Sequence, residues 1–497
     1  MPDQKNPSTK TRLDKPLLRL SNLKSSGKNH SKRKNIKVVG TEAKTKIGPK
    51  IKDVTSTRKQ PMSGDKKTVP NKLSSRKVTY DILVTVYRGT HLDKAFANNP
   101  ALLRLDDRDR RFVRLLATTC LRCRGQLEKV LTPMLARRPF GAQKNANLIL
   151  LMGAAQLLFL RTDEHAAVDS TVELMRQAGF DQLCGLANAV MRRLTREGEE
   201  LLAVTTAVDN LPEWLQQSWQ HYWGGAVTAA IADLAMLPPP LDITVKGDAA
   251  GWAEKLKAQC IDVNSLRRKF DGDPSLLEGF EEGLWWVQDL AAALPAHILN
   301  VSGGETVIDL CAAPGGKTAQ LIAAGAKVTA IDNNKTRLDR LRLNLKRLRF
   351  SANLFLGDAQ TYCPKSPVDA ILVDAPCSAT GTIRRRPDIL NHRGAPDINA
   401  LQQIQWELAT TALGWLRAGG RLVYATCSLQ PEEGEDIISA ILDGSDGQYA
   451  IDPITSIQAG IFARSITENG CIRILPNDYI DIGGVDGFFI ARLISLN

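Results

Sequence analysis

The chain has 497 residues and a formal net charge of +12; 43% of its residues are hydrophobic and 24% are charged. This composition is typical of globular proteins and excludes a chain that is disordered throughout. No apolar run reaches the roughly 20 residues that cross a bilayer, and the N-terminus lacks the apolar segment of a secretory signal. The nine cysteines follow no disulfide framework, so we expect a cytoplasmic protein with no membrane partner.

The excess positive charge lies entirely in the first 77 residues. Residues 1–77 contain 22 Lys and Arg against 5 Asp and Glu, whereas the remaining chain is slightly acidic. The segment has no aromatic residue, so it cannot bury enough apolar surface to offset the entropy cost of ordering. We expect a disordered basic tail over 1–77. It is either a solvated segment without a specific role or an electrostatic tether for RNA.

Residues 78–204 show apolar side chains at helical spacing, for example Tyr80, Leu83, Val84 and Tyr87. No strand-like alternation interrupts this pattern, which predicts an all-helical domain. The segments at 107–131 and 164–194 resemble the NusB-like helical fold, although any helical bundle would give the first of them. The resemblance implies an RNA-binding domain.

Residues 205–282 change in character. A Trp-rich helical stretch at 211–224 is followed by three prolines at 238–240, which stop a helix. Residues 241–247 then alternate like a strand. We expect a small α+β linker domain here.

Residues 283–497 alternate between short apolar runs and helical stretches from Glu305 onward. This order predicts a doubly wound, Rossmann-like α/β domain with mostly parallel strands, ending in a late strand at 487–494. The whole chain is therefore expected to be multidomain: an all-α domain, a small α+β domain and an α/β domain.

Ligands of such sheets bind beyond the carboxyl ends of the strands. The first strand is followed by a loop of small residues that matches neither a P-loop nor a G-x-G-x-x-G turn, and acidic residues end the next three strands. An acid after the second strand can hold ribose hydroxyls, and the next can reach an adenine edge. A nucleoside with a small polar tail fits this pattern, so S-adenosylmethionine (SAM) is favoured over NAD or ATP. The predicted binding residues are Cys311, Ala312, Ala313, Pro314, Gly315, Gly316, Lys317, Asp332, Asp358 and Asp374.

Two cysteines, Cys377 and Cys427, follow the fourth and fifth strands. A single apolar cysteine is usually inert, but two beside a methyl donor indicate nucleophilic catalysis. C5 of cytosine is a poor nucleophile. Addition of a thiolate to C6 makes the ring an enamine whose C5 can accept a methyl group.

The segments DLCAAPGGKT, DAPCSATGTIRRRPDI and ATCSLQPEEGED, in this order, resemble RNA cytosine-C5 methyltransferases of the NOL1/NOP2/Sun class. Together with the NusB-like domain, residues 78–497 resemble the Sun/RsmB type of 16S rRNA methyltransferase. The resemblance implies a SAM-dependent enzyme that modifies cytosine 967 of small-subunit rRNA. It also implies Cys427 as nucleophile, Cys377 in product release and Asp374 in orienting the cytosine; Lys317 could approach the reacting base.

Two positions depart from the usual pattern of the family. Arg386 stands where His is common and Gly434 where Asn is common, so the resemblance does not define the RNA contacts at these two positions.

We expect a monomer. No metal is predicted, because the six histidines show no ligand spacing and Cys120 and Cys123 lack a second pair. The alternatives are the same chemistry on tRNA and a non-catalytic RNA-binding or assembly factor.

Overall fold

The computed structural model describes residues 74–136, 139, 141–262, 264–270 and 272–497, which all lie in one unit of the chain, Val69–Asn497. Most of the predicted basic tail lies outside the described residues. Its last residues, however, are helical, because helix α1 begins at Ser75. Arg76 donates a hydrogen bond to Gln156 at 2.6 Å, and Lys77 pairs with Asp81. The last basic residues of the predicted tail therefore belong to helix α1 and contact other described residues.

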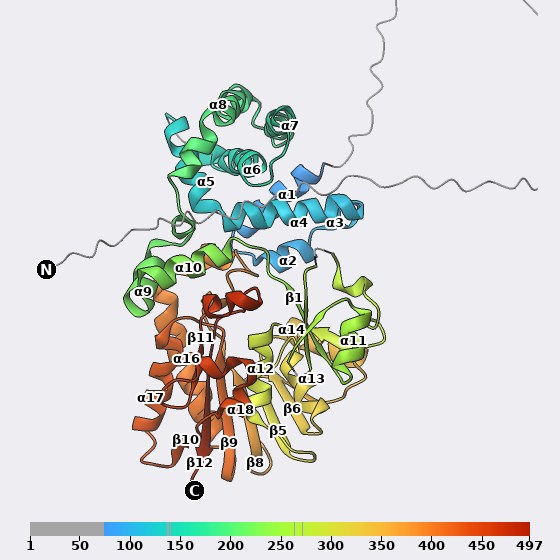
Figure 1. Cartoon of the computed structure of the whole chain (residues 1–497), viewed down its shortest axis with the longest axis vertical. Coiled ribbons are helices and arrows are strands. Elements are labelled where there is room, and N and C mark those ends of the chain that lie inside the picture. The colour runs from blue at the N-terminus through green and yellow to red at the C-terminus, as the bar shows by residue number, and fades with distance from the viewer. Residues whose placement is uncertain (1–73, 137–138, 140, 263, 271) are drawn as a thin grey trace, which may run out of the picture. The chain divides into compact units, whose positions relative to one another are not determined.

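The predicted helical domain is present and is built around one almost fully buried helix, α6. This helix is apolar on all sides, and its neighbours bury an apolar stripe against it. Figure 1 shows α6 next to α7 and α8. The main helices are α1 (Ser75–Val86), α2 (Leu92–Ala97), α3 (Pro100–Leu103), α4 (Asp107–Arg122), α5 (Arg124–Leu131), α6 (Ala146–Leu158), α7 (Glu164–Gln177) and α8 (Cys184–Ala203).

A small antiparallel sheet follows two helices, as the α+β prediction requires. Its strand order is β2-β3-β1-β4. The strand at 285–287 pairs with β1 through Trp285 and Trp286, so this sheet includes residues beyond 282, where we placed the domain boundary; the boundary itself stays a prediction. The elements are α9 (Glu213–Trp223), α10 (Gly225–Ala235), β1 (Leu241–Val245), α11 (Ala249–Lys255), β2 (Gln259–Asp262), β3 (Ser265–Arg268) and β4 (Trp285–Val287).

The large sheet has the order β10-β12-β9-β8-β5-β6-β7, with β11 paired to β12. Strands β5 to β9 are parallel, and β12 is antiparallel to its neighbours. The chain runs outward from β5 through β6 to β7 and then returns to β8, so the order reverses beside β5, where such sheets bind ligands. The strands are β5 (Thr306–Leu310), β6 (Lys327–Asp332), β7 (Asn353–Leu356), β8 (Val368–Asp374), β9 (Leu416–Thr426), β10 (Tyr449–Ile451), β11 (Ile472–Ile474) and β12 (Phe488–Ser495).

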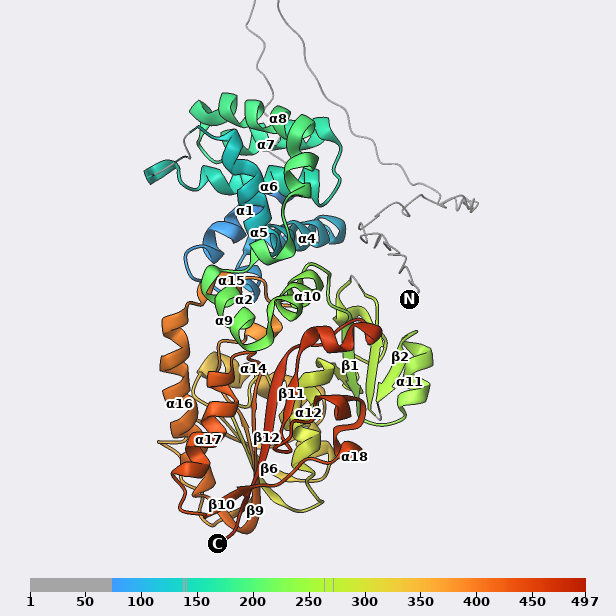
Figure 2. The same cartoon turned by 60° about the vertical axis from the view of Figure 1, so that its left-hand side comes forward.

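Helices cover both faces of this sheet, as expected of a doubly wound domain. Helices α16 and α17 pack against each other on one flank, and α12 packs against α13, β9 and β12. Figure 2 shows α16 and α17 side by side. The helices are α12 (Leu290–Leu299), α13 (Gly316–Ala323), α14 (Lys335–Arg347), α15 (Ile389–His392), α16 (Ala395–Leu413), α17 (Glu435–Asp443) and α18 (Ser456–Ala459).

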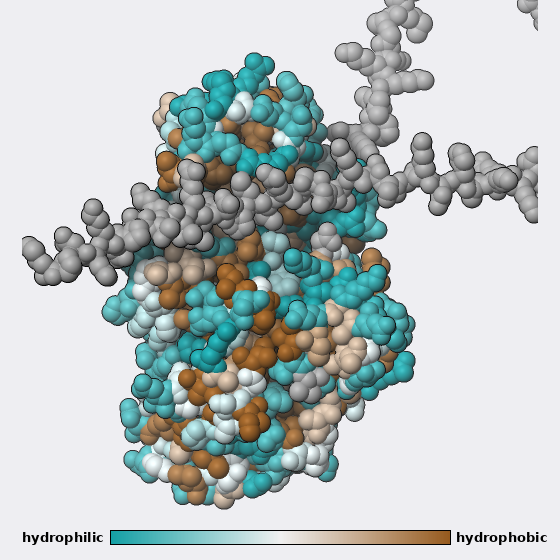
Figure 3. All heavy atoms as spheres, viewed as in Figure 1, coloured by the Kyte–Doolittle hydropathy of each residue, from teal (hydrophilic) through white to brown (hydrophobic). Residues whose placement is uncertain are grey.

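Polar and apolar residues are interspersed on the face of the molecule in Figure 3, and hydrophilic residues cover much of the helical domain there. Within the described part of the chain, no helix combines the length and apolar character that a membrane span needs.

Candidate active site

The loop after β5 is positioned by backbone conformation and by a buried acid. Cys311 and Gly315 have φ angles of 59° and 102°, and a Cβ on Gly315 would lie only 3.0 Å from Leu341. Glycine therefore suits this turn in both respects. The carboxylate of Asp332 at the end of β6 accepts a hydrogen bond from the Ala313 N–H at 3.2 Å. The loop and the predicted ribose-binding acid are thus in direct contact.

Asp332 also contacts Arg337, which reaches back from α14. Arg337 Nη2 lies 3.3 Å from Asp332 and donates to the Ala313 carbonyl at 2.7 Å. Asp332 is 2% exposed, so its charge is compensated by this arginine and by backbone N–H groups. These contacts give Asp332 a structural role, and its contact with ribose stays a prediction.

Asp358 lies two residues beyond the end of β7. Its Oδ1 atom accepts hydrogen bonds from the backbone N–H groups of Gln360 and Thr361 at 3.2 and 3.1 Å. These bonds are those of a turn residue. The residue lies at the predicted edge of the sheet, and its contact with adenine stays a prediction.

Lys317 and Asp374 form an ion pair at the centre of the site. Their Nζ and Oδ2 atoms are 2.9 Å apart, and the Lys317 side chain is 11% exposed. Burial lowers the pKa of Lys317. Asp374, Cys427 and Asp309 raise it, and together they outweigh burial, so the pKa of Lys317 lies above its ordinary value. Lys317 is thus a cation held near Cys427.

Cys377 and Cys427 approach each other from the ends of adjacent parallel strands. Their Sγ atoms are 3.5 Å apart, and both residues are partly buried. The hydrogen bond with Cys427, together with burial, raises the pKa of Cys377 well above its ordinary value. Cys377 is therefore a neutral thiol at neutral pH. The nucleophile must be a thiolate, so these surroundings do not favour Cys377 in that role, and the assignment of Cys427 as the nucleophile stays a prediction.

A buried glutamate that was not predicted joins the two cysteine loops. Glu433 accepts hydrogen bonds from the Ser378 backbone N–H at 2.8 Å, from the Ser378 hydroxyl and from the Ser428 hydroxyl at 2.5 Å. Gln405 donates a further bond at 3.0 Å. Ser378 and Ser428 directly follow the two cysteines, so one carboxylate positions both loops. Within the sequence run PEEGED, no local signal separates the buried acid from its less buried acidic neighbours.

Asp309, on β5 beneath the loop, is fully buried. Its Oδ2 accepts a hydrogen bond from Thr318 at 2.5 Å, while Oδ1 has no partner. Burial is the main reason that the pKa of Asp309 is raised to about 7, and the nearby Asp374 adds to the effect. A protonated Asp309 would leave Lys317 paired with Asp374 alone.

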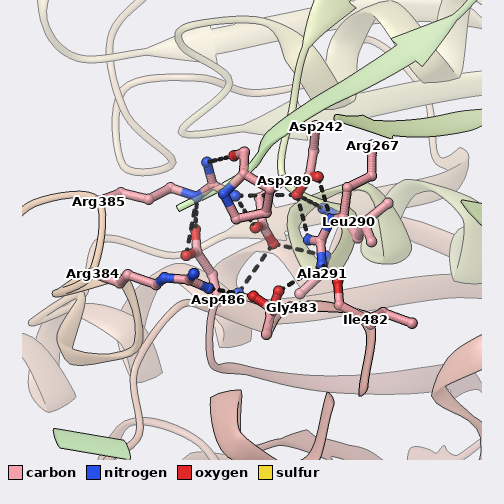
Figure 4. A network of polar contacts seen from close by, with 12 residues as sticks. Asp242, Arg267, Asp289, Leu290, Ala291, Arg384, Arg385, Ile482, Gly483 and Asp486 are labelled. Carbon is pink, nitrogen blue, oxygen red and sulfur yellow. Dashed lines mark hydrogen bonds and ion pairs between the residues drawn. The ribbon is translucent and has the colours of Figure 1, made fainter. Parts of the chain in front are cut away.

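The arginines after Cys377 are structural contacts rather than a free basic patch. Arg385 bonds to Asp242, Asp289 and Asp486 at 3.1, 2.5 and 3.1 Å, which joins the small sheet, α12 and the segment before β12. Figure 4 shows the three carboxylates around this guanidinium. Arg384 donates to backbone carbonyls at 237, 238 and 483. Of the three consecutive arginines only Arg386 is exposed. Arg386 is therefore the one of the three whose side chain is free to contact RNA.

Two family models match the chain: "16S rRNA methyltransferase RsmB/F" over residues 296–494 and "NusB family" over residues 73–196. A Pseudomonas putida protein named ribosomal RNA small subunit methyltransferase B is 37% identical over 421 residues, covering 80% of this chain and 93% of the relative. A Cronobacter sakazakii protein of the same name is 34% identical over 420 residues, with the same two shares.

Solved structures show the same fold. The crystal structure of PH0851 superimposes with a TM-score of 0.66 at 22% identity, covering 84% of this chain and 98% of the other. That of NSun6 from Pyrococcus horikoshii with SFG has a TM-score of 0.50 at 22% identity, covering 57% and 98%. The predicted fold class and family resemblance are thus confirmed, and the chain belongs to the RsmB/F family of 16S rRNA methyltransferases, SAM-dependent enzymes that act on RNA.

Proposed function

We propose that the protein methylates C5 of a cytosine in 16S rRNA, at cytosine 967, through a covalent adduct with Cys427. The observation that carries this proposal is the pair of cysteine thiols 3.5 Å apart beside the Lys317–Asp374 ion pair. Two thiols this close together suit a reaction that needs a nucleophile in one step and a proton-transfer group in another.

The Cys427 thiolate adds to C6 of the cytosine and forms a carbon–sulfur bond, which moves an electron pair toward C5. C5 would then attack the methyl group that SAM supplies, so that the new carbon–carbon bond forms as the sulfonium carbon–sulfur bond breaks and S-adenosylhomocysteine leaves. Loss of the C5 proton to a base and cleavage of the Cys427–C6 bond then restore the aromatic ring and release the thiolate. Cys377 lies beside the departing Cys427 sulfur, so we assign it to product release.

The residues around the two thiols fit SAM as the methyl donor and cytosine as the base that is methylated. The loop Cys311–Lys317, with Asp332, Asp358 and Asp374, would hold SAM at the edge of the sheet where the strand order reverses. Asp374 lies at the end of β8, next to Lys317, and would orient the cytosine and border the methyl donor. Lys317 compensates negative charge near Cys427. No metal takes part in these proposed steps.

We expect a monomeric cytoplasmic enzyme whose helical domain, over about residues 78–204, binds rRNA next to the small α+β domain and the methyltransferase domain. The names of the relatives support small-subunit rRNA as the substrate rather than tRNA. A non-catalytic assembly factor is disfavoured, because both thiols and the acids at the strand ends meet at one edge of the sheet.

The test compares purified wild type, Cys427→Ala and Cys377→Ala on 16S rRNA with labelled SAM. We expect no methylation by Cys427→Ala and accumulation of a denaturant-stable protein–RNA adduct by Cys377→Ala. Cys363→Ala, which changes an exposed cysteine, is the matched control and should behave as wild type. Normal turnover by Cys427→Ala would falsify the proposed nucleophile.

A second experiment tests the substrate and the position. Bisulfite sequencing of rRNA and tRNA from cells that lack the gene should show loss of a single 5-methylcytosine, in 16S rRNA. Loss in tRNA would support the alternative substrate, and unchanged RNA together with intact RNA binding would support the assembly factor.

A further inference from the structure

Three potential metal ligands from distant parts of the chain meet where the helical domain contacts the segment that follows Cys377. His91 precedes α2, whereas Asp388 and His392 lie four residues apart across the short helix α15. One ligand atom from each lies within 4.8 Å of the other two. Because His91 and Asp388 are 297 residues apart, spacing along the sequence could not indicate this cluster.

The distances suit a small divalent cation. His91 Nδ1 is 3.3 Å from Asp388 Oδ2, and His392 Nε2 is 3.7 Å from the same oxygen. Zinc bonds of about 2.0–2.1 Å in tetrahedral geometry separate neighbouring ligand atoms by roughly 3.3 Å. Two of the three separations are therefore within a few tenths of an ångström of what a bound zinc ion would impose.

His392 supplies an independent sign of a missing partner. Its side chain is only 10% exposed, and its Nε2 atom is buried without a hydrogen-bond partner. A buried ring nitrogen without a partner points to a ligand that would complete its contacts.

His392 Nε2 faces the Asp388 carboxylate oxygen, and a cation between the two atoms would be held by both of them. Asp388 is itself 4% exposed at its side chain and is oriented by a hydrogen bond from the Leu92 N–H at 3.1 Å. His91, which is 61% exposed at its side chain, leaves the cluster open to solvent on one side.

We propose that His91, Asp388 and His392 bind one divalent cation of the zinc class, with water as the fourth ligand. Two nitrogen ligands and one carboxylate oxygen suit Zn²⁺ or Co²⁺ better than Mg²⁺ or Ca²⁺, which prefer oxygen ligands. The ion would link the loop between α1 and α2 to the segment that carries Arg384 and Arg385. Its role is structural, since the cluster contacts neither the two thiols nor the Lys317–Asp374 pair.

The test uses the full chain, stripped with a chelator and titrated with Co²⁺ and then with Zn²⁺ in competition with a chromophoric chelator. Because exposed thiols also bind these ions, the titration is done in a Cys260→Ser, Cys363→Ser background. We expect one equivalent of metal and a Co²⁺ absorption spectrum without thiolate charge-transfer bands. His91→Ala, at an exposed position, and His392→Gln should each weaken the affinity by about tenfold or more.

His165→Ala, an exposed histidine of the same helical domain, is the matched control and should bind as the parent does. Added Zn²⁺ should also raise the unfolding temperature of the parent and of His165→Ala but not that of His91→Ala. The proposal is overturned if the parent binds no stoichiometric metal. It is equally overturned if His91→Ala binds metal, or is stabilised by it, as well as the parent.

Discussion

The Glu433 carboxylate accepts a hydrogen bond from the hydroxyl of Ser428, the residue after Cys427, at 2.5 Å, and it makes the equivalent contacts with the residue after Cys377. The distance between the two thiols therefore depends on a residue that contacts neither sulfur. A residue of this kind is a positioning residue, and its loss should alter the reaction geometry before it alters the binding of SAM.

Substitution Glu433→Gln tests this relationship. The amide has the volume of the acid but only one acceptor oxygen, so at least one donor from the cysteine loops loses its partner. We expect kcat to fall by about 10- to 100-fold while the KM for SAM changes less than twofold. Glu432→Gln is the control at the neighbouring position and should keep most of the activity. A wild-type kcat for Glu433→Gln would show that Glu433 does not position the two cysteines for the reaction.

Substitution Asp309→Asn should change how stability depends on pH. The pKa of Asp309 is about 7 in the folded protein and near 3.9 in an unfolded chain. Between these values the folded state binds more protons, so the contribution of Asp309 to stability is present below about pH 4 and is lost as the pH rises through about 7. The stability of Asp309→Asn relative to wild type should therefore increase over this range and then level off, by a few kcal/mol at most.

Urea unfolding at several pH values measures this difference, because contributions of the other groups cancel between the two proteins. A difference that stays constant from pH 4 to pH 8 would show that Asp309 is ionised throughout.

Substitution Arg385→Met should be strongly destabilising. It leaves the buried carboxylates of Asp289 and Asp486 without their main cationic partner and removes one of two arginines from Asp242. Breaking a buried ion pair costs about 3–5 kcal/mol. Arg386→Met, at the exposed neighbouring position, should change the free energy of unfolding by about 0.5 kcal/mol or less. Similar unfolding curves for the two variants would contradict the structural role of Arg385.

Removal of residues 1–73 tests whether the basic segment tethers RNA. Each lysine near a phosphate releases counterions on binding, so its loss weakens the affinity and flattens its salt dependence. We expect a lower slope of log affinity against log salt in filter-binding measurements, with turnover at saturating RNA maintained. Loss of that turnover would assign the segment a part in the reaction itself.

The sequence was sufficient to predict the parallel strands, because each is a short, largely apolar run, and the two cysteine motifs follow two of these runs. It could not show that Arg384 is buried and Arg385 half-buried. The partners of Arg385, Asp289 and Asp486, are distant in sequence, as are the carbonyls that Arg384 contacts, and the local run is typical of a solvated surface. The place of Trp285 and Trp286 in the small sheet could not be predicted for a similar reason. A strand is assigned to a sheet by the strand it pairs with, here β1.

The contacts of Arg385 also constrain how this protein can be recombined with its relatives. Asp242 comes from the small sheet, Asp289 precedes α12 and Asp486 precedes β12. A chimera that takes the methyltransferase domain from one homologue and the small sheet from another would have to inherit a matching acid at each place. Functional domain exchange should therefore succeed when residues 205–497 are transferred as a block, and fail when the junction falls between β1 and α12.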